Sequence, residues 1–337
     1  MKKILYVGNQ LKGKGQSVTT IDTLSTLLRG EGYKVVTTSN KTNKMLRLLD
    51  MVFTFLKNYK KIEVVLIDTY STTNFYYAYI LAKLATLFNV KYIPILHGGN
   101  LPNRLEKSPK WSAQLFGNAF KIVAPSNYLK QAFEKKGYQV VFIPNVLEMK
   151  NYRYQQRKQL QPNLLWVRSF ATIYNPQLAI QVVAKLKERY PHATLCMIGA
   201  DKGELQACKE LTQQLNIQNS VEFTGLLTPQ QWHKKSEDYD IFINTTNFDN
   251  TPVSVMEAMA LGLPVISTNV GGLPYLIDDG VDGILVKPND VKAFVQAIEN
   301  LLVNQDKGTT LTTNALQKVA QFDWETVKCQ WFNLLKE

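Results

Sequence analysis

Residues 248–272 read FDNTPVSVMEAMALGLPVISTNVGG, and this stretch decides both the fold class and the place of a candidate site. An apolar strand ends just before it, and a helix is predicted to begin near Pro252, because proline suits the first position of a helix. The free amides at the start of a helix attract anions. We therefore expect the backbone at Asn250, Thr251, Pro252 and Val253 to hold a diphosphate.

Glu257 is expected about one turn further along the same helix. Its neighbours Met256, Ala258 and Met259 are apolar, which predicts that its carboxylate is withdrawn from solvent. A carboxylate in this position can accept two hydrogen bonds from a ribose diol, as the acidic residue of dinucleotide-binding folds does. The pair Gly271-Gly272 is expected to form a second loop that approaches the same place.

The sequence on both sides of this stretch alternates short apolar strands with amphipathic helices, the pattern of doubly wound α/β domains. Runs of Val, Ile and Leu are typical of parallel strands that are covered on both faces. The expected strands of the first half are Lys3–Gly8, Lys34–Ser39, Val64–Thr69, Tyr92–Gly98, Lys121–Ser126 and Val140–Asn145. Those of the second half lie near residues 163–168, 194–199, 221–225, 241–246, 264–268 and 283–287.

The length of 337 residues favours two domains rather than a single hydrophobic core. The polar, aperiodic segment 149–162 is interpreted as the linker. The N-terminal Rossmann-like domain would cover residues 1–150 and the C-terminal one residues 151–322. In such sheets ligands bind beyond the carboxyl ends of the strands, so two facing domains would create a central cleft.

The opening stretch resembles the signature of retaining glycosyltransferase family 4, whose fold is GT-B. That signature is Glu-x7-Glu followed by Ala-Met-Ala-x-Gly-x-Pro-Val and a Gly-Gly pair. Glu257 matches the second Glu, AMALGLPVI matches the run that follows, and the first Glu falls on Asp249. The resemblance implies that Glu257 holds the ribose of a nucleotide-sugar and that Asp249 contacts hydroxyls of the sugar. It also implies that the last segment, 323–337, packs back on the N-terminal domain.

A second match concerns the donor diphosphate. The family usually has Gly-Arg-x5-Lys-Gly after the first strand of this domain, and both cations clamp the diphosphate. Arg168 matches the Arg, whereas Tyr174 stands at the Lys position. Either Tyr174 donates a neutral hydrogen bond there, or a cation comes from elsewhere. Weaker matches follow the next two strands, where the resemblance places the nucleobase beside Gly199, Thr224 and Gly225.

Two loops of the N-terminal half complete the predicted site. The loop after the first strand contains Gly13 and Gly15, which free the backbone to approach a ligand; in related glycosyltransferases this loop contacts the acceptor and the donor phosphates. His97, with Gly98 and Gly99, ends a buried strand. The resemblance places His97 beside the donor sugar, where it would orient the sugar or stabilise developing oxocarbenium charge.

No cofactor and no metal are expected. The sequence Asp238-Tyr239-Asp240 looks like a metal-binding Asp-x-Asp, but it falls at the start of a strand, on the side away from the expected cleft. Three scattered cysteines without metal-ligand spacing favour a reduced, cytoplasmic compartment. The longest apolar run is too short to span a membrane.

The net charge of +12 is unevenly distributed. Residues 1–150 hold 22 Lys and Arg against 8 Asp and Glu, so this half carries +14 and the remainder −2. The excess is interpreted either as a solvated basic face or as attraction to an anionic bilayer or a phosphate-bearing acceptor. Nucleic acid is not expected, because the sequence has no recognition motif.

The resemblance implies a metal-independent, retaining transfer of a hexosyl group from a UDP- or GDP-sugar to a glycan or lipid-linked acceptor. The implied mechanism is front-face, with the leaving diphosphate assisting deprotonation of the acceptor. No carboxylate of the N-terminal loops stands out as a base or nucleophile. The alternatives are a nucleotide-sugar epimerase of the same fold and a binding protein without catalysis. An enzyme of polysaccharide biosynthesis, peripheral on the inner face of the membrane, is the expected setting.

Overall fold

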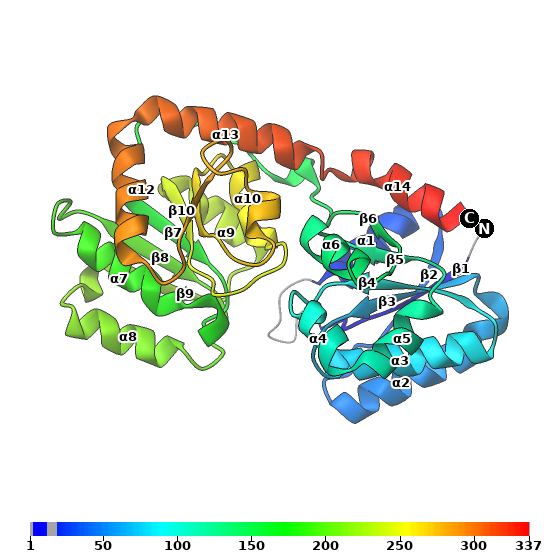
Figure 1. The fold of residues 1–337 in the computed structure, drawn as a ribbon. Helices are drawn as coiled ribbons and strands as arrows, with labels where there is room; N and C mark the ends of the chain where they lie inside the picture. Colours follow the sequence, from blue (N-terminus) through cyan, green and yellow to red (C-terminus); the bar gives the residue numbers. More distant parts are fainter. Residues whose placement is uncertain (1–2, 12–18, 337) are drawn as a thin grey trace. The chain divides into compact units, whose positions relative to one another are not determined.

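The computed structural model describes residues 3–11 and 19–336 and divides into two compact units (Figure 1). Unit 1 comprises Met1–Val146 together with Trp324–Glu337, and unit 2 comprises Leu147–Asp323. Each unit contains a six-stranded parallel sheet with helices on both faces, as the alternating strand and helix pattern predicted.

The sheet of unit 1 has the strand order β2-β1-β3-β4-β5-β6. Its strands are β1 (Lys3–Val7), β2 (Lys34–Thr38), β3 (Val64–Thr69), β4 (Lys91–Leu96), β5 (Ile122–Ala124) and β6 (Val140–Phe142). Its helices are α1 (Thr20–Gly30), α2 (Lys44–Asn58), α3 (Thr73–Leu87), α4 (Leu101–Lys107), α5 (Pro109–Gly117), α6 (Asn127–Glu134) and α14 (Trp324–Lys336), with the 3₁₀ turn η1 (Tyr59–Lys61).

Alternate residues of the unit 1 strands face opposite layers of helices. Leu5 and Val7 of β1 pack with α2 and α3, whereas Ile4 and Tyr6 pack with α1 and α14. The sequence analysis did not predict α4 and α5. Both have a proline within their first two positions, and each is too short to show a clear helical period.

The sheet of unit 2 has the order β12-β11-β10-β7-β8-β9. Its strands are β7 (Asn163–Val167), β8 (Thr194–Ile198), β9 (Val221–Gly225), β10 (Ile241–Asn244), β11 (Val265–Thr268) and β12 (Ile284–Val286). Its helices are α7 (Pro176–Leu186), α8 (Leu205–Gln214), α9 (Pro229–Lys235), α10 (Val253–Ala260), α11 (Leu273–Leu276), α12 (Val291–Val303) and α13 (Gln305–Ala320), with 3₁₀ turns at 149–151, 172–174, 218–220 and 236–238.

Each sheet contains one point at which the direction of its crossovers reverses. In unit 1 this point lies between β1 and β3, and in unit 2 between β7 and β10. The loops that follow the two strands diverge there, and ligands of open α/β sheets bind beyond the carboxyl ends of the strands at such points. The strand orders therefore direct attention to the residues that follow β7 and β10. None of the helices in the described part of the chain is long and apolar enough to cross a membrane.

The segment 149–162, which the sequence suggested as a linker, is anchored to unit 2 by Arg157. The guanidinium of Arg157 donates to the carbonyl oxygens of Ser236 (2.7 Å), Tyr239 (2.6 Å), Leu261 (3.1 Å), Gly262 (3.0 Å) and Gln155 (3.0 Å). Burial lowers its pKa to about 10, so it keeps its charge at neutral pH. Arg157 thus joins this segment to the C-terminal end of α10.

We expect Arg157→Met to destabilise unit 2 by roughly 3 kcal/mol or more, because the shorter apolar side chain leaves several buried carbonyl oxygens without donors. Urea unfolding followed by circular dichroism measures this change. The exposed neighbour gives the matched control, since Lys158→Met should leave the unfolding midpoint nearly unchanged. Equal midpoints for the two variants would show that Arg157 does not anchor the segment.

Candidate functional site

Arg168 directly follows β7, at the switch point of the unit 2 sheet. Its N–H donates to the carbonyl oxygen of Ile198 at 3.0 Å. A Cβ atom on Gly199 would overlap the carbonyl group of Arg168, so only glycine fits after β8. The backbone of Arg168 is therefore fixed by the neighbouring strand.

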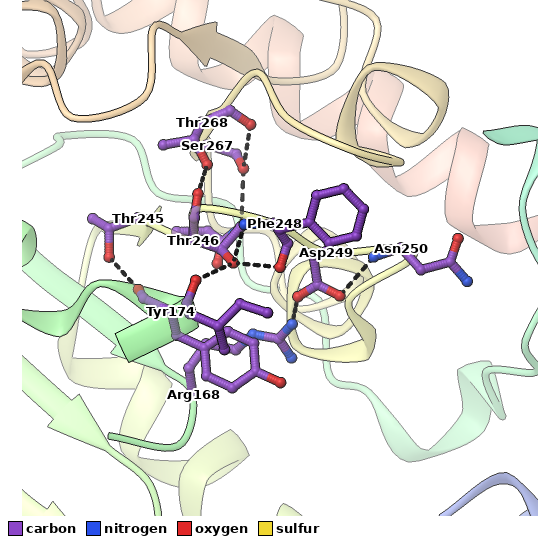
Figure 2. Close-up of polar contacts among 11 residues, drawn as sticks. Arg168, Tyr174, Thr245, Thr246, Phe248, Asp249, Asn250, Ser267 and Thr268 are labelled. Atoms are coloured by element: carbon purple, nitrogen blue, oxygen red, sulfur yellow. Dashed lines mark hydrogen bonds and ion pairs between the residues drawn. The ribbon is translucent and has the colours of Figure 1, made fainter. Parts of the chain in front are cut away.

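The side chain of Arg168 lies between an aromatic ring and a carboxylate (Figure 2). Its guanidinium carbon stands 4.4 Å from the ring centroid of Tyr174, and one terminal nitrogen forms an ion pair with Oδ2 of Asp249. Only 16% of the side chain is exposed, and Nε has no hydrogen-bond partner among the described residues. Burial lowers the pKa of Arg168 from its usual value. Tyr174 thus contacts the cation through its ring.

Buried threonines fix the loop that follows β10. The hydroxyl of Thr245 lies 3.0 Å from the carbonyl oxygen of Tyr174, and that of Thr246 lies 3.0 Å from the carbonyl oxygen of Phe248 (Figure 2). From β11, Thr268 donates to the carbonyl oxygen of Thr246 at 2.6 Å. These bonds hold the loop in the position from which Asp249 reaches Arg168.

The start of α10 differs in detail from the expected anion site. The helix begins at Val253, close to the predicted start, but Pro252 is its cap and not its first residue. Pro252 has no N–H to offer, and the N–H of Asn250 donates to Oδ1 of its neighbour Asp249 at 2.8 Å. Within the described residues, the N–H groups of Thr251, Val253 and Ser254 have no recorded acceptor. The expected set of amides is therefore corrected by removing Asn250 and Pro252 and adding Ser254.

Ser254 carries a second unpartnered group. Its hydroxyl oxygen is buried and has no hydrogen-bond partner in residues 3–11 and 19–336, and the residue is 8% exposed. A buried hydroxyl without a partner is uncommon in proteins, and this one is suited to a polar ligand. The sequence analysis missed Ser254. The signal was its place in the first turn of the helix, where a hydroxyl and an N–H can face the same anion.

The glycine pair packs against the loop that carries Asp249. The N–H of Gly272 donates to the carbonyl oxygen of Asp249 at 2.9 Å. A Cβ atom on Gly271 would overlap Asp249, and one on Gly272 would overlap the carbonyl of Asn250. Gly271 also has a φ of +55°, in the left-handed region. The pair thus packs directly against the backbone of Asp249 and Asn250 and fixes its position.

Glu257 is held by two side chains from other segments. Its Oε1 accepts from the hydroxyl of Tyr152 at 3.1 Å and lies 3.3 Å from Nε2 of His233. Burial, with the nearby charge of Glu257, raises the pKa of Tyr152, so that its hydroxyl stays protonated and donates. The side chain of Glu257 is 13% exposed, and Oε2 has no recorded partner in the described part of the chain. One oxygen is therefore braced while the other can accept from a ligand.

The turns after β8 and β9 lie next to each other. The N–H of Gly199 donates to the carbonyl oxygen of Gly225 at 2.9 Å, and the hydroxyl of Thr224 lies 3.0 Å from the same oxygen. Gly225 has a φ of +72°. The backbone of these turns is thus fixed beside Arg168.

The corresponding edge of unit 1 holds a buried acid–imidazole pair. Nε2 of His97, which follows β4, lies 2.9 Å from Oδ1 of Asp68 in β3. Tyr6 of β1 donates to the same oxygen at 2.9 Å, and Oδ2 of Asp68 is buried without a partner in the described part of the chain. Burial and the charge of Asp68 raise the pKa of Tyr6 well above its usual value, so Tyr6 remains a donor.

Sequence reasoning missed Asp68, because it searched the loops for a carboxylate. The available signal was an aspartate at the end of an otherwise apolar strand, VVLIDT. A Cβ on Gly98 would lie 2.7 Å from the N atom of Ser71, so glycine allows the close turn after His97. Gly99 lies in the turn that precedes α4. The predicted residues Gly13 and Gly15 fall outside the described residues.

Other features of the described residues do not add to these groups. No cluster of three or more His, Cys, Asp or Glu side chains that could hold a metal ion occurs among them. Asp240 precedes β10 and accepts from Asn163 at the amino edge of the sheet. A surface cavity of about 560 Å³ in unit 1 lies beside Lys91 and Val64, at the amino ends of β4 and β3. It is at the opposite end of β4 from His97 and contains none of the candidate site residues.

Comparison with known proteins gives the same fold and adds a family. Over 156 residues, the chain is 28% identical to the D-inositol 3-phosphate glycosyltransferase of Corynebacterium jeikeium; the match covers 44% of this chain and 37% of that relative. The chain thus spans less than half the length of this curated relative. The sucrose-phosphate synthase of Thermosynechococcus elongatus matches 100% of the chain and 98% of its own, with a TM-score of 0.85 and 18% identity.

HepE of Anabaena, solved in complex with UDP and glucose, matches 100% of both chains with a TM-score of 0.80 and 16% identity. These likenesses show that the fold is GT-B, as the sequence predicted. The family model described as "Glycosyl transferases group 1" matches residues 149–318, which include every candidate residue of unit 2. The chain therefore belongs to the group 1 family of glycosyl transferases.

Proposed function

We propose that this protein is a retaining glycosyltransferase that moves a hexosyl group from a UDP- or GDP-sugar to a glycan or lipid-linked acceptor. The observation that carries the proposal is Arg168, a buried guanidinium at the switch point of the unit 2 sheet with Nε unpartnered. Free amides at the start of α10 complement it. A guanidinium and helix amides together are suited to a diphosphate.

The donor would be bound by residues of unit 2. Its diphosphate would contact Arg168 and the amides of Thr251, Val253 and Ser254, and its ribose would donate to Oε2 of Glu257. The nucleobase would lie by the backbone turns at Gly199, Thr224 and Gly225. Because Asp249 is paired with Arg168 in this structure, phosphate oxygens must compete with that carboxylate. A released Asp249 could then accept from hydroxyls of the sugar.

The reaction would break the bond between the sugar C1 and the leaving phosphate oxygen and form a bond from C1 to the acceptor oxygen on the same face. The proton of the acceptor hydroxyl would pass to the leaving diphosphate. Arg168 and the helix amides would stabilise the negative charge that develops on that group, without a metal. The role proposed for His97 is to orient the sugar, with Asp68 fixing its imidazole.

The proposed setting is polysaccharide biosynthesis on the cytoplasmic face of a membrane. The charge of +14 in residues 1–150 against −2 in the remainder supports an anionic surface or a phosphate-bearing acceptor near the N-terminal half. Nucleic acid is not part of the proposal.

The function is tested with a panel of UDP- and GDP-hexoses, first by thermal shift and then by turnover with glycan and lipid-linked acceptors. We expect one donor to raise the melting temperature and to give free nucleotide with a new glycoside of unchanged anomeric configuration, also in the presence of EDTA. A changed sugar on an intact nucleotide would instead identify an epimerase. Stabilisation without any turnover would identify a binding protein.

We expect Glu257→Ala to weaken binding of the preferred nucleotide-sugar by roughly tenfold or more, because it removes the acceptor for the ribose diol. Isothermal titration calorimetry measures the dissociation constant. Tyr152→Phe, which removes only the bracing hydroxyl, should give a smaller loss. Glu210→Ala, on the exposed side of α8, is the control and should bind like the unchanged protein. Unaltered affinity of the Glu257→Ala protein would reject the donor site.

Substitutions at Arg168 and Tyr174 are expected to lower kcat/KM by different amounts, according to how much of the diphosphate contact each one removes. Arg168→Ala should lower kcat/KM by about a hundredfold, because the developing charge loses its cation. Tyr174→Ala should cause a loss of roughly fivefold through the missing ring contact, whereas Tyr174→Phe keeps the ring and should stay near the original value. If Tyr174→Phe were as impaired as Tyr174→Ala, the hydroxyl of Tyr174, and not its ring, would be the functional group.

A further inference from the structure

Helix α2 of unit 1 exposes a continuous stripe of large apolar side chains. Within its 15 residues, the exposed fractions are 68% for Met45, 56% for Leu46, 60% for Leu49, 65% for Phe53 and 42% for Leu56. At the helical repeat these five side chains fall within about 100° of the circumference. We call this set the α2 stripe. Isolated apolar residues on a surface are ordinary, but a continuous stripe indicates a surface that meets a partner.

The stripe is not the face by which α2 packs into the fold. Met51 and Phe55 point the other way and are buried against the unit 1 core, with Leu48 and Val52 beside them. Figure 1 shows α2 at the outer side of its helical layer, next to α3. The helix thus has two apolar faces. The fold of unit 1 uses one of them and leaves the α2 stripe without a partner among the described residues.

Exposed lysines lie at both ends of the α2 stripe. Residues 41–61 contain the exposed side chains of Lys41, Lys44, Lys57, Lys60 and Lys61, and no ion pair is recorded for these lysines within the described residues. The segment has a single acidic residue, Asp50, whose Oδ2 already accepts from Thr38 at 3.0 Å. Arg47 points inward and donates to Asn9 at 3.0 Å. The exposed charge beside the stripe is therefore entirely that of lysine.

We propose that the α2 stripe inserts into the interfacial layer of an anionic lipid bilayer, with α2 parallel to the membrane plane. An apolar stripe on one side of a helix together with nearby lysines is the composition of interfacial helices. The ammonium groups of the lysines at the two ends of α2 would meet lipid phosphates. Protein interfaces, by contrast, are depleted in lysine and enriched in Arg, Trp and Tyr. The composition therefore favours a bilayer over a second protein.

This inference deepens the proposed membrane-side location and names the surface responsible. It does not depend on the donor chemistry, because the α2 stripe and the candidate donor residues belong to different units. A lipid-linked or membrane-proximal acceptor would be reached more readily by an enzyme held at the bilayer. If the unchanged chain binds a nucleotide-sugar but no vesicles, only the proposed membrane surface is contradicted. If it binds vesicles but no nucleotide-sugar, only the proposed donor site is contradicted.

The test is co-sedimentation of the full chain with vesicles of phosphatidylcholine, with and without phosphatidylglycerol. We expect binding to the anionic vesicles that weakens as salt is added. Leu49→Ser with Phe53→Ser should reduce the partition coefficient by roughly tenfold. The matched control, Val281→Ser with Val303→Ser, removes side chains of similar exposure (52% and 74%) from unit 2 and should bind like the unchanged protein.

A second pair of variants tests the charge. Lys57→Gln, Lys60→Gln and Lys61→Gln together should lower binding to anionic vesicles by at least about tenfold. The combination Lys158→Gln, Lys209→Gln and Lys292→Gln makes the same change of net charge on exposed positions of unit 2 and should have little effect. Circular dichroism and nucleotide-sugar affinity, measured on every variant, establish that the chain remains folded.

Three results would overturn the proposal. The unchanged chain could fail to bind either kind of vesicle, or the stripe variants could bind as well as their controls. The chain could also form a dimer in sedimentation velocity that the Leu49 and Phe53 substitutions dissociate, without any vesicle binding. In that last case the α2 stripe is an interface between two copies of the protein.

Discussion

The candidate site depends on how one buried cation is held. Arg168 has lost most of its contact with water, and such a charge is costly unless a protein supplies other partners. Here the aromatic face of Tyr174 and the carboxylate of Asp249 supply them. Gly199 allows close approach to the backbone of Arg168, and the pair at 271–272 allows close approach to the loop that carries Asp249. A change of side chain size in any of these loops would therefore move the cation itself.

The two units organise polar groups in the same way but with different chemistry. In each, an aspartate or glutamate at a carboxyl edge is satisfied on one oxygen by neighbours and left open on the other. Glu257 uses Tyr152 and His233, whereas Asp68 uses Tyr6 and His97. Half-satisfied carboxylates of this kind are pre-oriented for a donor of hydrogen bonds, since their rotamers are already fixed.

The sequence was sufficient for the strands, the fold class and the turn into α10, because buried parallel strands and a proline at a helix start leave strong local patterns. It was not sufficient for contacts made over long separations. Nothing local indicates that Tyr174 would stack on Arg168, or that Tyr152 would brace a carboxylate 105 residues away. Asp68 was missed because the search for a carboxylate covered the loops, whereas Asp68 stands near the end of strand β3. The amide of Asn250 was misjudged because its preference for the adjacent side chain of Asp249 is a matter of geometry.

Because α2 has two apolar faces, one of them stays exposed to water and affects the solubility of the chain. In water the five large side chains of the α2 stripe are exposed to solvent. Repulsion between the lysines near the stripe opposes association of one molecule with another. Raising the ionic strength screens that repulsion while it strengthens apolar attraction. We therefore expect the exposed stripe to lower the solubility of this chain in concentrated salt, and expect dilute buffer or mild detergent to keep it in solution.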